Sequence, residues 1–149
     1  MLERSDAALL VIDVQGKLAD SMHGRDALME QIGRAVRGAR ALGLPVLWTE
    51  QVPEKLGPTV PALAALLEEA GARPIPKRAF SCCGEPAFAA ALRATGRRQV
   101  LLAGIEAHVC VYQTAAGLVS AGYEPHLLAD AVSSRAAANR DVGIAKSRE

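Results

Sequence analysis

The most constraining feature of the sequence is a series of short apolar runs that alternate with helical patterns. Four runs are clear, and a fifth, weaker run is held extended by its two prolines. These runs span residues 7–12, 45–49, 99–103, 125–129 and, for the weaker one, 73–76. Short runs that are apolar throughout are typical of strands buried on both faces of a parallel sheet. The sequence therefore predicts five strands of this kind.

Segments with apolar residues at three- and four-residue spacing fill the gaps between these runs. They predict helices over 26–42, 59–70, 86–94 and 108–120, and a last helix that starts at Ser133 or Ser134 and runs through Ile144. Repeated strand–helix units with right-handed crossovers build a doubly wound α/β fold, a parallel sheet with helices on both faces. No linker, repeat or low-complexity tract interrupts the pattern, so we expect one domain over residues 1–149.

Composition excludes several classes of partner. The net charge is +1 and aromatic residues make up 3% of the chain, which disfavours binding to nucleic acid or to a membrane surface. No stretch approaches the roughly 20 apolar residues of a membrane-spanning helix. The three cysteines lack the spacing of a disulfide framework, and two of them, Cys82 and Cys83, are adjacent. These features predict a reducing, cytoplasmic environment.

Reactive residues follow several of the predicted strands. Asp13 follows the first strand, Gln51 the second, Lys77 the third and Glu106 the fourth, and Cys110 comes in the first turn of the next helix. Ligands of open parallel sheets bind beyond the carboxyl ends of the strands, so we expect these side chains to converge there.

This combination favours nucleophilic catalysis by Cys110. The helix N-terminus and the Lys77 ammonium are expected to favour the thiolate, and the Asp13 carboxylate can take the thiol proton and return it to a leaving group. Backbone N–H groups before and at Cys110 can hold an oxyanion. We therefore expect Cys110 to attack an amide-like carbonyl and form a thioester that water cleaves, without a cofactor. Each residue also has a structural interpretation: a buried small side chain, a turn cap and a solvated lysine.

Three segments carry a family resemblance. AALLVIDVQ, PKRAFS and LLAGIEAHVCVYQTA resemble the isochorismatase-like hydrolase superfamily, and the pattern is most similar to the cysteine hydrolases of the isochorismatase-domain-containing branch. TEQVPEKLGPTVPAL is typical of the same branch. The resemblance extends from about Ala7 to the end of the chain and implies a doubly wound α/β fold.

The resemblance also implies roles for particular residues. The catalytic Asp, Lys and Cys of the family fall on Asp13, Lys77 and Cys110. A cis peptide bond is implied at Ile105–Glu106, where the Glu106 N–H would form an oxyanion hole with that of Cys110. The pocket-lining residues implied by the resemblance are Gln15, Gln51 and Phe80. Assembly into a homo-oligomer is a further implication.

Departures from the family pattern narrow the expected activity. Nicotinamidases of the superfamily carry a histidine-containing metal cluster after the second strand, where this chain reads Thr49-Glu50-Gln51-Val52-Pro53, so we expect no metal. Isochorismatases proper do not use the cysteine nucleophile, so Cys110 disfavours that substrate. Family chains usually run some tens of residues further, so a C-terminally shortened domain, with the last strand of the sheet missing, is also expected.

The sequence thus predicts a metal-independent cysteine hydrolase that cleaves a C–N bond of a small amide or imide. The alternative is a non-catalytic binding or scaffold protein of the same fold. His108 is two residues from Cys110, which places the two side chains about 200° apart on a helix and disfavours a catalytic pair. Glu106 is open to two interpretations, a contact to a substrate amine or a structural salt bridge.

Overall fold

A five-stranded parallel sheet forms the centre of the protein. The computed structural model describes residues 1–149. The strands are β1 (Ala7–Ile12), β2 (Val46–Gln51), β3 (Pro74–Lys77), β4 (Gln99–Ile105) and β5 (Glu124–Ser133), in the spatial order β3-β2-β1-β4-β5. Every neighbouring pair is parallel. The chain therefore winds outward from β1 in both directions, which confirms the predicted doubly wound architecture.

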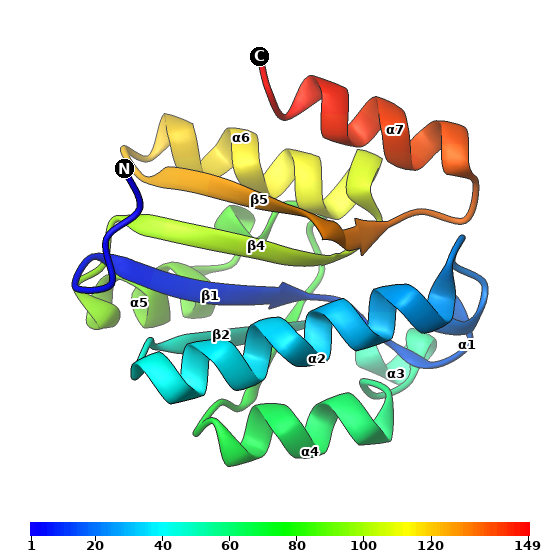
Figure 1. Ribbon diagram of the computed structural model, residues 1–149, viewed down its shortest axis with the longest axis horizontal. Coiled ribbons are helices and arrows are strands. Elements are labelled where there is room, and N and C mark those ends of the chain that lie inside the picture. The colour runs from blue at the N-terminus through cyan, green and yellow to red at the C-terminus, as the bar shows by residue number, and fades with distance from the viewer.

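Helices cover both faces of this sheet (Figure 1). They are α1 (Gly16–Asp20), α2 (Arg25–Leu42), α3 (Pro53–Leu56), α4 (Pro61–Glu69), α5 (Pro86–Thr95), α6 (Tyr112–Ser120) and α7 (Ala137–Lys146). Two short turns complete the list, a 3₁₀ turn at Cys82–Gly84 and a π-helical turn at Ala107–Val111 that leads directly into α6.

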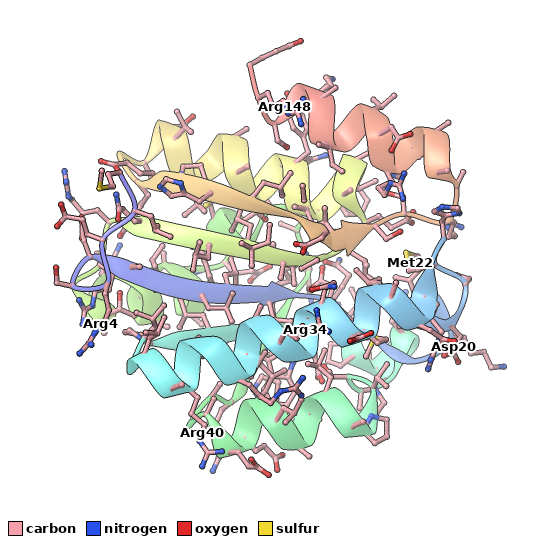
Figure 2. All side chains as sticks on the ribbon, viewed as in Figure 1. Arg4, Asp20, Met22, Arg34, Arg40 and Arg148 are labelled. Atoms are coloured by element: carbon pink, nitrogen blue, oxygen red, sulfur yellow. The ribbon has the colours of Figure 1, made fainter.

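The core is split between the two faces of the sheet. Alternate residues of β1 point to opposite sides: Leu9 and Val11 pack against α2 and α4, whereas Leu10 and Ile12 pack against α5 and α6. On the outer surface, Arg40 of α2 lies toward α4, where it pairs with Glu69 (Figure 2). The central strand β1 is apolar throughout because both of its faces are buried.

Several boundaries differ from the sequence prediction. The fifth strand runs from Glu124 to Ser133, beyond the predicted 125–129, and the last helix begins at Ala137 rather than at Ser133 or Ser134. The α1 and α3 helices and the Cys82–Gly84 turn span five residues or fewer. Elements this short show no apolar periodicity, so the sequence did not predict them.

The end of β1 has an unusual backbone. Asp13 has a φ of +55°, a left-handed conformation that aspartate tolerates better than most residues. Gly104 of β4 pairs with Ile12, and a Cβ at Gly104 would lie 2.1 Å from the Ile12 carbonyl oxygen. Glycine at position 104 therefore permits the close approach that positions the turn carrying Asp13.

The π-helical turn is supported from outside the sheet by α7. A Cβ on Gly143 of α7 would lie 2.5 Å from the Ala107 carbonyl carbon and the same distance from the His108 nitrogen. The helix thus packs directly on the backbone of the turn that carries Cys110. π-Helical turns are rare and are often found at functional sites.

Candidate active site

A cavity of about 210 Å³ opens at the carboxyl edge of the sheet. It is lined by Asp13, Leu18, Gln51, Leu56, Phe80, Ile105, Glu106, Val109, Cys110 and Arg135. These residues come from the carboxyl ends of β2 and β4 and from the segments that follow each of the five strands. The register of the sheet explains the convergence, because Ile12 pairs with both Thr49 and Gly104, and Gln51 pairs with Lys77.

Asp13 and Lys77 form a buried ion pair beside this cavity. Lys77 Nζ lies 2.8 Å from Asp13 Oδ2, and both side chains are almost fully buried. Lys77 donates its hydrogen bonds elsewhere, to Gln51 Oε1 and to the carbonyl oxygens of Ala79 and Phe80. An ammonium has three N–H groups, so its contact with Oδ2 is electrostatic.

The two carboxylate oxygens of Asp13 differ in their surroundings. Oδ1 accepts a hydrogen bond of 2.8 Å from the Thr49 hydroxyl, whereas Oδ2 is buried and lies 2.8 Å from the Lys77 ammonium. Burial raises the pKa of Asp13 above its ordinary value of 3.8, and Lys77 partly offsets this effect. Apart from this contact with the ammonium, Oδ2 has no hydroxyl donor and is able to accept a proton.

Cys110 faces this acceptor from the first helical turn. It is 8% exposed and lines the cavity together with Asp13. Burial raises the pKa of the Cys110 thiol to about 12, and the negative charge and hydrogen bond of Asp13 act in the same direction, whereas Lys77 lowers the pKa. The expectation that the resting site favours the thiolate is therefore wrong, because burial and the Asp13 charge outweigh the effect of the ammonium.

Because the resting thiol of Cys110 holds its proton, its rate of alkylation does not report whether the protein is an enzyme. Fast reaction with iodoacetamide well below the ordinary thiol pKa of about 8.5 is not expected for the resting protein. Slow labelling of Cys110 therefore does not distinguish a hydrolase from a binding protein. The Asp13 carboxylate is the base in this cavity that could accept the thiol proton.

The backbone before Cys110 offers hydrogen-bond donors. The peptide bond between Ile105 and Glu106 is cis. The N–H of Glu106 donates to no acceptor in the structure. Glu106 and Cys110 both line the cavity, so this N–H is available to an oxyanion formed by attack of Cys110.

Glu106 forms a salt bridge in the structure. Its carboxylate accepts from the Arg135 Nε at 3.1 Å and from the Arg135 backbone N–H at 3.2 Å. Of the two interpretations of Glu106, the ion pair is the one observed. The sequence analysis missed Arg135, which lines the cavity, because this residue follows β5 without any motif that marks it.

His108 does not contact Cys110. Its Nδ1 lies 2.9 Å from the Ser134 hydroxyl and 4.0 Å from the Glu106 carboxylate. The prediction that His108 and Cys110 form no catalytic pair agrees with these contacts. His108 instead connects the nucleophile turn to the segment that follows β5.

Of the three residues expected to line the pocket, Gln15, Gln51 and Phe80, two do so. Gln51 and Phe80 line the cavity, although Phe80 is 55% exposed. Gln15 does not line it, contrary to expectation. Its amide is fully buried, donates to the carbonyl oxygens of Gln51 and Gly57, and accepts from the Gln51 N–H. Gln15 therefore holds the end of β2 in place, because a buried amide must satisfy both of its ends.

Neither a metal cluster nor a membrane span is found. No group of three or more His, Cys, Asp or Glu side chains is arranged to hold a metal ion. None of the helices combines the length and apolar character needed to cross a bilayer.

Lys77→Met is expected to lower the free energy of unfolding by about 3–5 kcal/mol at pH 7, because it leaves the buried Asp13 charge unpaired. The exposed Lys55→Met is the matched control and should change it by less than about 0.5 kcal/mol. Urea denaturation followed by circular dichroism measures both variants.

The stability deficit of Lys77→Met should also depend on pH. The folded pKa of Asp13 lies above 3.8 and rises further without Lys77, so stability is lost as pH rises through that folded value. The deficit should therefore shrink as the pH falls toward 4. A deficit that is equal at all pH values would show that the lost packing of Lys77, rather than its charge, is responsible.

A doubly wound parallel sheet, with a buried Asp–Lys pair beside a cysteine on a helical turn, defines the class of this protein as a three-layer α/β protein. The isochorismatase domain model matches residues 7–148. The chain therefore belongs to the isochorismatase domain family.

Known proteins resemble the chain over nearly its whole length. It is 39% identical over 142 residues to isochorismatase domain-containing protein 2A of Mus musculus, a match that covers 95% of this chain and 66% of the mouse protein. The chain thus spans about two thirds of the length of that relative.

Two solved structures share the fold. The MAR1 ribonuclease of Caenorhabditis elegans is 34% identical with a TM-score of 0.88, covering 99% of this chain and 74% of that one. The YcaC gene product of Escherichia coli, described as an octameric hydrolase of unknown specificity, is 24% identical with a TM-score of 0.90, covering 99% and 73%. At this identity, the second likeness supports the fold alone.

Proposed function

We propose that the protein is a metal-independent cysteine hydrolase that cleaves a C–N bond of a small amide or imide through a thioester. The observation that carries this proposal is the pairing of Asp13 and Cys110. The Asp13 carboxylate is buried beside the Lys77 ammonium, and the thiol of Cys110 lines the same cavity as this carboxylate.

The first half of the reaction forms the thioester. Asp13 Oδ2 takes the thiol proton as Cys110 Sγ forms a bond to the substrate carbonyl carbon. The carbonyl oxygen becomes an oxyanion that accepts hydrogen bonds from the backbone N–H groups of Glu106 and Cys110. Asp13 then gives its proton to the substrate nitrogen, the C–N bond breaks, and ammonia or an amine leaves.

The second half releases the acid. Asp13 takes a proton from water while the water oxygen attacks the thioester carbonyl carbon. The C–S bond then breaks, the sulfur regains a proton from Asp13, and a carboxylic acid is released. Lys77 remains an ammonium throughout and keeps the Asp13 carboxylate available as a base in its buried position.

Cavity size and charge support a small neutral substrate. The volume of about 210 Å³ is below the range of roughly 300–1,000 Å³ typical of drug-sized ligands. Both carboxylates in the cavity wall are paired with cations, Asp13 with Lys77 and Glu106 with Arg135. A neutral amide or imide therefore needs no countercharge from the wall.

Two alternative functions are a ribonuclease and a binding protein without turnover. The name of the Caenorhabditis elegans relative is that of a ribonuclease, whereas the small cavity and a net charge of +1 favour a small substrate here. The second alternative is a binding protein without turnover. Self-association into a homo-oligomer and a cytoplasmic location are parts of the proposal.

A release screen tests the activity. The protein is incubated with small amides, ureides and imides, and separately with an RNA oligonucleotide, each with and without EDTA. We expect ammonia release from at least one amide or imide that EDTA does not reduce, and a covalent acyl adduct on the tryptic peptide 99–135, which contains Cys110 but neither Cys82 nor Cys83. Cleavage of RNA alone, or binding of amides without adduct or turnover, would contradict the proposal.

A further inference from the structure

The Thr49 hydroxyl is the one hydrogen-bond donor to Asp13 that the proposed reaction does not use. Thr49 lies in β2 next to Ile12 of β1 and is fully buried. Its hydroxyl donates to Asp13 Oδ1 at 2.8 Å. A carboxylate held at one oxygen cannot rotate freely, so this bond determines which oxygen faces the thiol.

Cys82 holds the same hydroxyl from the other side. Its Sγ lies 3.7 Å from Thr49 Oγ1, and its own backbone N–H donates to Thr114 of α6. The hydrogen of the Thr49 hydroxyl is used by the carboxylate, so the thiol of Cys82 is the donor in this contact. Burial raises the pKa of Cys82 to about 11, so the thiol keeps the proton that it donates.

We propose that Thr49 is a positioning residue for the hydrolase reaction: its hydroxyl, oriented by Cys82, holds Asp13 Oδ1 and leaves Oδ2 free to take the proton of Cys110. The inference rests on the proposed function, because it assigns the orientation of that function's base. It also gives the buried Cys82 a role as a neutral donor beside the site.

The charged and titratable groups around Asp13 are few. They are Lys77 from β3, Cys82 from the 3₁₀ turn and Cys110 from the π-helical turn, with the Glu106–Arg135 pair in the same cavity wall. A substitution at Thr49 leaves all of them in place. A change in the titration of Asp13 then reports the loss of the hydroxyl.

The test compares Thr49→Val, which removes the hydroxyl at nearly constant volume, with Thr49→Ser, which retains it. The protein is labelled with ¹³C at the aspartate carboxyl carbon, and the Asp13 signal is assigned by its absence in Asp13→Asn. We expect Thr49→Val to raise the Asp13 titration midpoint by about one to two pH units, because a donor to the ionised form is lost. Thr49→Ser should restore the midpoint, and Cys82→Ala should raise it by less than Thr49→Val does.

A matched control separates positioning from general loss of stability. Thr59 is also buried, and its hydroxyl bonds Trp48 and Glu50 rather than Asp13. Thr59→Val should leave the Asp13 midpoint unchanged. An unchanged midpoint in Thr49→Val, or an equal shift in Thr59→Val, would overturn the inference.

The titration requires no substrate, so it can fail independently of the proposed function. If no amide is hydrolysed but the midpoint shifts as expected, the hydrolase proposal falls and the positioning of Asp13 stands. With an active substrate, the acidic limb of the kcat/KM profile should move to higher pH by the same amount as the midpoint. A limb that stays in place while the midpoint shifts would show that Asp13 is not the base.

Discussion

Replacing Cys110 by alanine is expected to lower the turnover of an amide substrate by at least about 10³-fold while the protein stays folded. The thiol is the only group at the site that can form the thioester. Its sulfur lies in the wall of an open cavity, so its removal is expected to cost only about 1 kcal/mol of stability. Ammonia release and thermal denaturation measure the two effects.

The control for this variant is a second cysteine outside the cavity wall. Cys83→Ala removes a thiol from the 3₁₀ turn without touching the cavity, and it should turn over at the parent rate. The acyl adduct on peptide 99–135 should be absent in Cys110→Ala and present in Cys83→Ala. Parent-rate turnover by Cys110→Ala would remove the cysteine from the mechanism.

Asp13→Asn is expected to have opposite effects on the reactivity of Cys110 and on catalysis. The Asp13 charge raises the pKa of the thiol, whereas Lys77 lowers it. Without the carboxylate, burial still raises the pKa of the thiol but the Asp13 charge no longer does, so the midpoint of iodoacetamide labelling should move to lower pH by about one to three units. Turnover should nevertheless fall by about 10²–10⁴-fold, because no group remains to protonate the leaving nitrogen.

A lower labelling midpoint together with reduced turnover distinguishes a catalytic base from a residue that only stabilises the site. A residue that only stabilises the site would, when replaced, lower labelling and turnover together. The matched control is Asp6→Asn, which removes a carboxylate paired with Arg98 near the other end of β1 and should change neither measurement. Turnover at the parent rate in Asp13→Asn would overturn the assignment of the base.

The strands of the sheet could be predicted because burial of a strand leaves a mark in its own short stretch of sequence. Ala7–Ile12 is apolar throughout since both faces of β1 are buried, and such a run is visible without any knowledge of its neighbours. The short Pro74–Lys77 strand was also recognised from the extended conformation that its prolines favour. The far end of β5 was missed because Asp130 interrupts the apolar run, and an exposed polar residue there does not end the strand.

The sequence predicted which residues converge at the candidate site, but not the pKa of the Cys110 thiol. Asp13, Lys77 and Cys110 each follow a recognisable element, and parallel strands bring those ends together. The sequence does not show which charge lies nearer the thiol or how deeply the thiol is buried, so the sign of its pKa shift was wrong. Gln15 was misplaced for a related reason, since its direction depends on the unusual turn at Asp13. The places of Arg135 and Thr49 at the site became visible only in the three-dimensional contacts.

The position of α7 has a consequence for how the site is assembled. Gly143 lies directly on the backbone of the turn that carries Cys110, and 130 residues separate it from Asp13. The first residue of the site to be synthesised and the last support for the nucleophile thus come from opposite ends of this sequence. An intact site therefore requires contact between elements far apart in sequence: a chain that has built its sheet but has not docked α7 has all its reactive groups but lacks the helix that supports them.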